Sequence, residues 1–366
     1  MQNFYKAIGV MSGTSLDGLD LAFCEFRFEK SRWTYQLKIA ETIDYTSDWK
    51  HRLQNAVNVS GLELALLNAD YGHFLGREIR QFMDKNQLDA DLISVHGHTI
   101  FHQPEKHLTL QIGDGAAIAS YVNAPVVTQF RNTDIALGGQ GAPLVPIGDR
   151  LLFDSANLCL NLGGIANISF KEHTKTTAFD ICVCNMALNH LARTVRGGPA
   201  YDKNGNFAAS GQLDSHLLET LNNLDFFKKQ PPKSLGFEWF ENRFLPILNG
   251  FDCSIENKLH TVCEHIAEQI AAVVNAQPDI SNKTMMVTGG GAKNNFLMAR
   301  IKQHSLCKIE ESHPLLIDFK EALIFAFLGV LRIRGEVNCL ADVTGAWQDN
   351  IGGCVYLGVD PRVFGR

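Results

Sequence analysis

Hydroxyl, glycine and acidic side chains crowd one short stretch near the start of the chain, GVMSGTSLDGLD at residues 9–20. Gly13 and Gly18 permit close approach of the backbone to a ligand, and successive backbone N–H groups can form an anion-binding nest. Asp17 and Asp20 would repel a bare phosphate, so they make sense as ligands of a Mg²⁺ ion lying between them and it. The stretch therefore predicts a phosphate site, with an ordinary hairpin turn as the alternative.

The flanking residues indicate that this stretch joins two strands. YKAIGVM (5–11) is typical of a buried strand, and LDLAFCEFRF (19–28) alternates over ten residues, as strands do. A Walker phosphate loop would carry Gly-Lys-Ser/Thr and open a helix, and the dinucleotide-binding fingerprint also needs a helix. Both are excluded, because no helix follows.

A second hairpin of the same design is predicted at NLCLNLGGIANISF (157–170), which indicates a duplicated architecture. TAFD follows as a short strand ending in Asp180, and 181–195 is predicted to be a helix. Asp180 is either placed for chemistry or serves as the helix N-cap. A third loop, Gly289–Gly291, lies between a strand and a helix beginning near Asn294 or Asn295, where a flat or charged ligand could approach. A flexible connection is the alternative there.

The overall composition argues against a nucleic-acid-binding, membrane-spanning or secreted protein. The chain has 366 residues, enough for two domains, and its net charge of −6 shows no footprint for nucleic acid or an anionic membrane surface. No apolar run reaches membrane-spanning length, and the first residues lack the features of a secretory leader. Nine cysteines without a C-x-x-C pair favour free thiols in a reducing compartment. We therefore expect a cytoplasmic protein.

Two further polar features stand out. HGHTIFHQPEKH places His96 and His98 on one strand face, yet no carboxylate or cysteine follows at a metal-ligand spacing. A polar wall of a binding site is therefore favoured over a metal site. Glu321 lies near the start of a helix, 319–333, that is apolar nearly all round. Because buried acids need partners, Glu321 is a candidate ligand-binding residue.

The chain resembles the anhydro-N-acetylmuramic acid kinase family. Motifs typical of that family occur in the family's order along nearly the whole chain, as GVMSGTSLDGLD (9–20), SVHGHTIFHQP (94–104), LQIGDGAAIA (110–119), VVTQFRNTDIALGGQGAPLVP (126–146), LNLGGIANIS (160–169), FD with Asn185 (179–185), AYDKNGNFAASG (200–211), VTGGGAKNNFLMARI (287–301), EALIFAFLG (321–329) and VTGA (343–346).

The resemblance implies an α/β fold of duplicated actin-like ATPase (ribonuclease H-like) domains around a central nucleotide cleft. Its domains would be 1–150 and 151–366. It implies a kinase that opens the anhydro bridge of 1,6-anhydro-N-acetylmuramic acid with water and phosphorylates O6, using ATP and Mg²⁺. Homodimers are also implied.

The resemblance also assigns residues. Asp180 would be the catalytic base, and the sugar would contact His96, Gly97, Arg131, Asp180 and Glu321. ATP would contact the first loop, the second hairpin and the third loop, through Gly13, Thr14, Ser15, Leu16, Asp17, Gly18, Leu19, Asp20, Gly163, Gly164, Gly289, Gly290 and Gly291.

One stretch departs from the family pattern. After Asp180 the family usually reads Thr-Gly-Pro, whereas this chain reads Ile181, Cys182 and Val183, then Cys184 before Asn185. The two cysteines are predicted to be buried thiols. A related kinase acting on a different sugar, or a catalytically weakened binding regulator, therefore remain as alternatives.

Overall fold

The computed structural model describes residues 2–13, 16–171, 176–195, 198–231, 233–310 and 312–359. It divides the chain into two compact units, Met1–Phe153 with Phe319–Arg366, and Asp154–Asp318. The sequence-based division at residue 150 assigned 319–366 to the second domain, whereas contacts group them with the first. None of the helices in the described ranges combines the length and apolarity that crossing a membrane requires.

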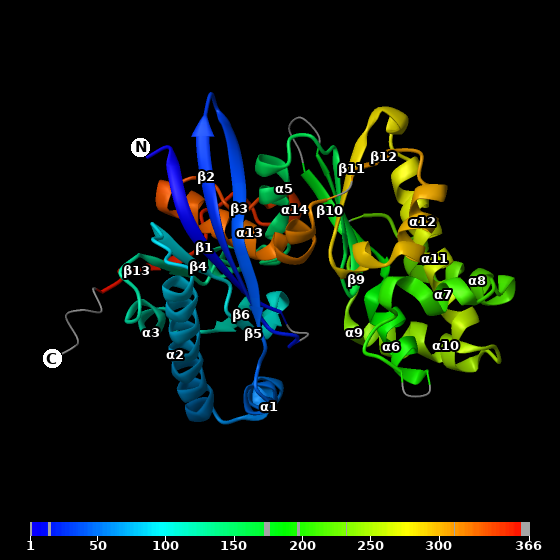
Figure 1. The fold of residues 1–366 in the computed structure, drawn as a ribbon, viewed down its shortest axis with the longest axis horizontal. Helices are drawn as coiled ribbons and strands as arrows, with labels where there is room; N and C mark the ends of the chain where they lie inside the picture. The colour runs from blue at the N-terminus through cyan, green and yellow to red at the C-terminus, as the bar shows by residue number, and fades with distance from the viewer. Residues whose placement is uncertain are drawn as a thin grey trace. The chain divides into compact units, whose positions relative to one another are not determined.

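The first unit is built on a mixed sheet in the order β13-β7-β4-β1-β2-β3 (Figure 1). β1, β2 and β3 are antiparallel neighbours, and β4 and β7 run parallel to β1. The strands of this sheet are β1 (Phe4–Ser12), β2 (Leu19–Glu29), β3 (Arg32–Ile43), β4 (Leu92–Val95), β7 (Val126–Thr128) and β13 (Cys354–Tyr356). A separate two-stranded sheet is formed by β5 (His98–Gln103) and β6 (Leu108–Ile112). The helices of this unit are α1 (Ser47–Asn55), α2 (Gly61–Lys85), α3 (Gly115–Ala119), α4 (Asn132–Ala136), α5 (Val145–Leu152), α14 (Ala341–Thr344) and, from Phe319 onward, α13 (Pro314–Arg334).

Two long helices cover opposite faces of this sheet. Ile8 and Val10 of β1 share a core cluster with Tyr71 and Leu75 of α2. The alternate residue, Gly9, faces α13, where an added Cβ would overlap the Ala322 carbonyl oxygen. Because successive residues of a strand point to opposite faces, this spacing places α2 on one side and α13 on the other. Glycine at position 9 allows α13 to approach β1 closely.

The second unit repeats the strand order. Its sheet is β10-β9-β8-β11-β12, with β8, β9 and β10 antiparallel and β11 and β12 parallel to β8. The first strand of each unit thus lies between an antiparallel second strand and a parallel fourth. Its strands are β8 (Leu158–Leu162), β9 (Ile165–Lys171), β10 (Thr176–Val183), β11 (Thr284–Thr288) and β12 (Lys308–Glu310). Its helices are α6 (Asn185–Thr194), α7 (Asn206–Ser210), α8 (Ser215–Asn222), α9 (Phe237–Trp239), α10 (Leu245–Gly250), α11 (Ile255–Asn275) and α12 (Asn295–His304).

The α/β class and the duplication predicted from the two hairpins are confirmed by this shared topology. Residues 181–183, however, continue β10 rather than beginning a helix, because Cys182 and Val183 pair with β9 after a bulge between Asp180 and Cys182. α6 begins at Asn185 with Cys184 at its N-cap position. Asp180 is therefore not a helix cap.

Candidate functional site

The first loop lies between β1 and β2, as predicted. Leu16 is buried in a left-handed conformation (φ 58°), and its N–H donates to the Gly13 carbonyl at 3.3 Å. An added Cβ at Gly18 would meet the Ile43 carbonyl oxygen of β3 at 2.9 Å. Thr14 and Ser15 lie outside the described residues. Leu16 and Gly18 therefore shape the turn, and Leu19 is the buried first residue of β2.

A buried hydrogen-bond chain holds the residue that precedes this loop. Ser12 Oγ lies 2.8 Å from Tyr45 Oη and 2.9 Å from His98 Nδ1. Tyr45 Oη lies 2.6 Å from Tyr71 Oη on α2. Burial lowers the pKa of His98 to about 4, so its imidazole is neutral at physiological pH. The start of the loop is thus fixed from inside the first unit, a feature sequence reasoning missed.

The two acids proposed for Mg²⁺ differ in their surroundings. Asp17 is exposed, whereas Asp20 is half-buried and its Oδ1 accepts a hydrogen bond from Thr42 Oγ1 at 2.6 Å. Carboxylate oxygens suit Mg²⁺, which usually takes one or two from the protein and the rest from phosphates and water. Within the described ranges, the one group of three metal-ligand side chains close enough to share an ion is Glu264, Glu268 and His304.

Arg131 is brought together with His96 and Gly97 in the first unit. Its Nε and Nη2 lie 3.1 and 2.9 Å from His96 Nε2, and its Nη1 donates to the Gly141 carbonyl at 2.6 Å. Because a guanidinium only donates, His96 Nε2 accepts, and Nδ1–H donates to the Gly97 carbonyl at 2.8 Å. Burial, followed by the charge of Arg131, holds the pKa of His96 well below its ordinary value.

The shared strand face predicted for His96 and His98 is wrong. His96 follows β4, whereas His98 begins β5, in a separate two-stranded sheet. Their partners differ accordingly, Arg131 for one and Ser12 for the other. The bend at Gly97 (φ 78°) separates them.

Glu321 lies near the kink of α13 at Phe319. Solvent reaches its side chain, yet surrounding protein desolvates the carboxyl and raises its pKa, against the attraction of Arg131 and Lys320. The neighbouring Lys320 forms a buried ion pair with Asp149 of α5 at 2.8 Å. Glu321 is thus an accessible acid held within electrostatic range of Arg131.

Asp180 is half-buried in β10 of the second unit. Its N–H donates to the Lys233 carbonyl at 3.1 Å, and its Oδ2 accepts a hydrogen bond from the Leu235 N–H at 2.8 Å. Burial raises the pKa of Asp180, and the Leu235 donor opposes that rise. Residues 233–235 therefore hold this carboxylate by one oxygen. The sequence contains no local signal for the contact, since the partners are 55 positions apart.

The second hairpin and the third loop converge inside the second unit. The Gly163 carbonyl accepts from the Asn185 N–H at 3.1 Å, and the Gly164 carbonyl accepts from the Met186 N–H at 3.1 Å. Asn185 Nδ2 also donates to the Leu162 carbonyl at 2.8 Å. The carbonyl groups of the hairpin thus accept hydrogen bonds from the first residues of α6, and the Asn185 side chain adds a further bond to the hairpin.

The glycines of the third loop pack against the same hairpin. Gly289 has φ 83°, and an added Cβ there would meet the Leu162 carbonyl oxygen at 2.8 Å. An added Cβ at Gly291 would meet Leu162 Cβ at 2.7 Å, and one at Gly290 would meet Asn185 Nδ2 at 3.5 Å. The helix after the loop begins where the sequence predicted, with Asn294 accepting from the Leu297 N–H at 3.0 Å.

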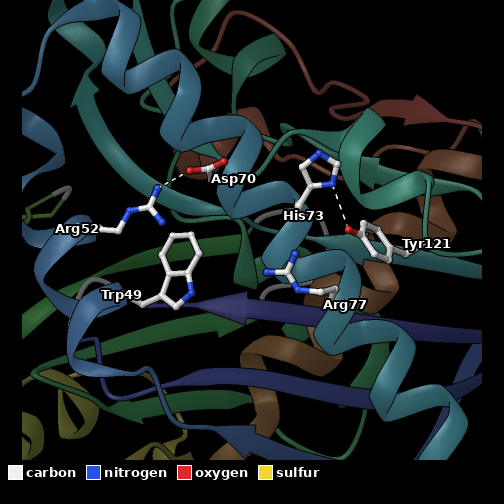
Figure 2. A pocket seen from close by; sticks show the side chains of 6 residues that line it. All are labelled: Trp49, Arg52, Asp70, His73, Arg77 and Tyr121. Carbon is white, nitrogen blue, oxygen red and sulfur yellow. Dashed lines mark hydrogen bonds and ion pairs between the residues drawn. The ribbon is translucent and has the colours of Figure 1, made fainter.

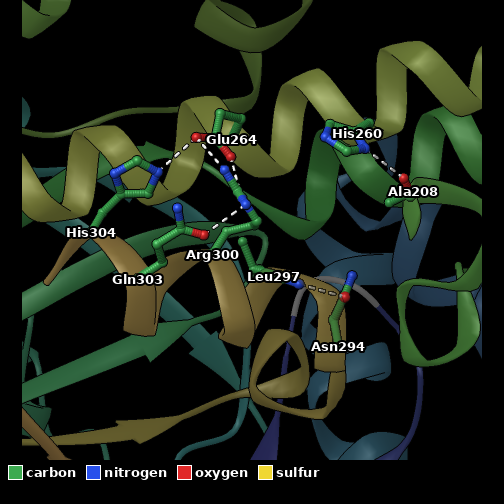
Figure 3. A network of polar contacts seen from close by, with 8 residues as sticks. All are labelled: Ala208, His260, Glu264, Asn294, Leu297, Arg300, Gln303 and His304. Atoms are coloured by element: carbon green, nitrogen blue, oxygen red, sulfur yellow. Dashed lines mark hydrogen bonds and ion pairs between the residues drawn. The ribbon is translucent and has the colours of Figure 1, made fainter. Parts of the chain in front are cut away.

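A polar network holds α12 against α11 (Figure 3). Glu264 accepts from both Arg300 and His304, with Nη2–Oε1 and Nε2–Oε1 distances of 2.8 and 2.6 Å. Although burial raises it, these hydrogen bonds bring the pKa of Glu264 below its ordinary value. The Arg300 guanidinium hydrogen-bonds to the Glu264 carboxylate, which a metal ion would need as a ligand. We therefore interpret the cluster as a support for α12 and the loop before it.

A separate pocket of about 360 Å³ lies on the first unit (Figure 2). None of its lining residues was predicted as a site residue, and Asp70 already pairs with Arg52 at 2.6 Å. The lining consists of Trp49, Arg52, Asp70, His73, Arg77 and Tyr121.

Comparisons with known proteins agree with the motifs. A family model described as anhydro-N-acetylmuramic acid kinase matches residues 5–358. An anhydro-N-acetylmuramic acid kinase of Paramagnetospirillum magneticum is 33% identical over 356 residues, covering 95% of this chain and 98% of the relative. One from Vibrio vulnificus is 34% identical over 359 residues, covering 93% and 95%. Among solved structures, a 2-hydroxyisocaproyl-CoA dehydratase activator from Clostridium difficile with bound ADPNP covers 91% of this chain and 98% of its own, at 13% identity and a TM-score of 0.42. The chain belongs to the anhydro-N-acetylmuramic acid kinase family.

Proposed function

We propose that this chain opens the 1,6-anhydro bridge of 1,6-anhydro-N-acetylmuramic acid with water and transfers the γ-phosphoryl group of ATP to O6. The product is N-acetylmuramic acid 6-phosphate, an intermediate of bacterial cell-wall recycling. The family match across residues 5–358 carries this proposal. It agrees with the retention of Asp180 and Asn185 at the positions expected of the family.

Asp180 acts as the base. It takes a proton from the water that attacks the anomeric carbon, and the bond from that carbon to O6 breaks. O6 then attacks the γ-phosphorus, and ADP leaves. We assign this task to Oδ1 of the half-buried carboxylate, since the Leu235 N–H holds Oδ2.

The sugar is bound by Arg131, Glu321, His96 and Gly97. Neutral His96 accepts from Arg131 and so fixes the plane of the guanidinium. Glu321 supplies an accessible carboxyl that can accept from sugar hydroxyls. The turn of α13 that carries Glu321 is held by the ion pair between Lys320 and Asp149.

ATP is bound by the three glycine loops, namely residues 13–20, Gly163 with Gly164, and Gly289–Gly291. Asp17 and Asp20 would hold Mg²⁺, which offsets charge on the transferring phosphoryl group when bound. At Gly164 an added Cβ would meet Met186 at 3.7 Å, an ordinary contact, so packing does not require glycine. Close approach of a phosphate would require it.

The departure after Asp180 does not favour a weakened regulator. Ile181, Cys182, Val183 and Cys184 are all buried in the core of the second unit. Their bulk is therefore accommodated by packing rather than presented to a ligand. A homodimer and a cytoplasmic location remain predictions.

The test is a turnover assay with Mg-ATP and 1,6-anhydro-N-acetylmuramic acid, following ADP release and weighing the sugar product. We expect a product heavier by one water and one phosphoryl group. Asp180→Asn should lower kcat by at least about 10²-fold, because it keeps the shape and removes the base.

Asp225→Asn is the matched control, an exposed aspartate of the same unit that should retain wild-type kcat. Turnover of other sugars in preference to this one would favour the related-kinase alternative. Binding of ATP and sugar without turnover would favour the regulator.

A further inference from the structure

Asp134 is a fully buried carboxylate that the proposed reaction does not use directly. Its Oδ1 accepts from Thr344 Oγ1 at 2.7 Å, Asn350 Nδ2 at 2.9 Å and Cys339 Sγ at 3.1 Å. Its Oδ2 accepts from the Gly141 N–H at 2.7 Å. Four donors on one carboxylate satisfy a buried negative charge, which would otherwise be costly.

Gly141 is the link from this carboxylate to the sugar site. Its N–H is held by Asp134, and its carbonyl is held by Arg131 Nη1 at 2.6 Å. Gly141 has φ 65°, a conformation that suits glycine, and an added Cβ would crowd Ile135 at 2.9 Å. Gly141 therefore links Asp134 to Arg131 through its two backbone hydrogen bonds. Arg131 precedes Asp134 by three residues in the sequence.

The guanidinium orientation depends on this link. An arginine has five N–H donors, and three of those of Arg131 are directed at His96 and the Gly141 carbonyl. The directions of the remaining guanidinium N–H groups are therefore set by the positions of His96 Nε2 and the Gly141 carbonyl oxygen. His96 is fixed by β4 and Gly97, whereas Gly141 lies in a loop without regular structure and depends on its own contacts.

We propose that Asp134 is a positioning residue for sugar recognition, holding Gly141 so that its carbonyl orients Arg131. The three donors from residues 339–350 make the C-terminal part of the first unit a component of this support. The inference rests on the proposed role of Arg131 in binding the sugar.

The test separates the Michaelis constants for the two substrates. Asp134→Asn keeps the size but replaces one acceptor oxygen by a donor, which faces another donor. We expect KM for the sugar to rise at least about tenfold, the loss typical of one charge-assisted hydrogen bond. Neither kcat nor KM for ATP should change by more than about threefold. Thr344→Val removes a single donor and should raise KM for the sugar by a smaller factor.

Asn338→Leu is the matched structural control. The Asn338 side chain is also buried, and it bonds Leu328 and Gly352 but neither Gly141 nor Arg131. Its backbone N–H, which donates to the Asn350 carbonyl, is retained in the leucine variant. It should lower Tm while leaving KM for the sugar unchanged. If Asn338→Leu raises KM for the sugar as much as Asp134→Asn does, or if neither Asp134→Asn nor Thr344→Val changes it, the positioning role is overturned.

Hydrogen exchange of the single Gly141 amide in the substrate-free protein gives a second readout, because its N–H donates to Asp134 whereas the neighbouring Gln140 N–H donates to the Thr344 carbonyl. Faster exchange of the Gly141 amide in Asp134→Asn but not in Asn338→Leu supports the link from Asp134 to Gly141, and unchanged exchange in Asp134→Asn overturns it. This result does not depend on turnover. A wild-type protein that fails to phosphorylate the sugar would count against the proposed function alone.

Discussion

Two opposing effects act on the carboxyl of Asp180. Burial favours its neutral form, and the Leu235 N–H favours its charged form. The balance leaves the pKa above the ordinary value of an aspartate. A base must be deprotonated to accept a proton, so this balance decides how far activity extends into acid.

Replacing the Leu235 amide by an ester removes the N–H donor and keeps the side chain. Because the donor stabilises the carboxylate, its loss raises the pKa of Asp180 further. The acid limb of the pH profile of kcat/KM, which falls as Asp180 takes up a proton, should therefore move to higher pH. Leu235→Ala keeps the N–H and should leave the limb in place. An ester variant with the wild-type limb would contradict this account.

Local sequence patterns were sufficient to propose residues for chemistry and insufficient to propose those that would orient them. Asp180 and Arg131 could be proposed because they occur in motifs. Asp134 lies inside the motif at 126–146, but nothing local marks it as the acceptor for residues 339–350. Its position three residues after Arg131 on a short helix is the one signal that could have drawn attention to it.

At the scale of elements, glycines in the second hairpin and in the third loop of the second unit have different physical roles. Gly289 is required by the fold, since its left-handed φ and the nearby Leu162 carbonyl exclude a side chain. Gly164 has room for a Cβ and does not have a left-handed φ. Packing within the fold therefore requires glycine at position 289 and does not require it at position 164.

This contrast predicts two alanine variants with opposite effects. The free energy of unfolding of Gly164→Ala should lie within about 1 kcal/mol of the wild-type value, because the backbone at this position is compatible with alanine. Its KM for ATP should rise, since the methyl group obstructs the phosphates. Gly289→Ala should lose about 1–3 kcal/mol of stability through backbone strain. Thermal unfolding and ATP kinetics check both, and a Gly164→Ala protein with the wild-type KM for ATP would contradict the hairpin's proposed role.

The boundary of β10 shows why periodicity fails at a bulge. Alternation along TAFDICV is interrupted between Asp180 and Cys182, and residues 181–184 are buried without exception. An unbroken apolar run before a clear helix is most simply interpreted as part of that helix. The bulge that interrupts the alternation also lies between Asp180, which is half-buried, and the fully buried residues that follow it.

At the scale of the whole molecule, the first unit is assembled from two separate segments of the chain and the second from one. The apolar helix at 319–333 was predicted to be buried, but its composition cannot say against which sheet. The answer depends on contacts such as that between Gly9 of β1 and Ala322 of α13. The second unit has a contiguous chain and its own core cluster.

Separate fragments should therefore behave differently. Residues 154–318 alone should unfold cooperatively, whereas residues 1–153 alone should not, because the face of β1 and β4 that contacts α13 would be uncovered. Coexpression of 1–153 with 319–366 should restore a cooperative transition. Circular dichroism during thermal unfolding measures this, and a cooperative transition for 1–153 by itself would argue against the assignment.

The same discontinuity sets an order of events during synthesis. After residue 153 has left the ribosome, the 165 residues of the second unit are made before α13 can cover the first sheet. At a translation rate of about 5–20 residues per second, that interval is on the order of ten seconds or more. The second unit can mature first, while the nascent first sheet waits with an apolar face exposed. Chaperone dependence in the cell should therefore concentrate on the N-terminal segment.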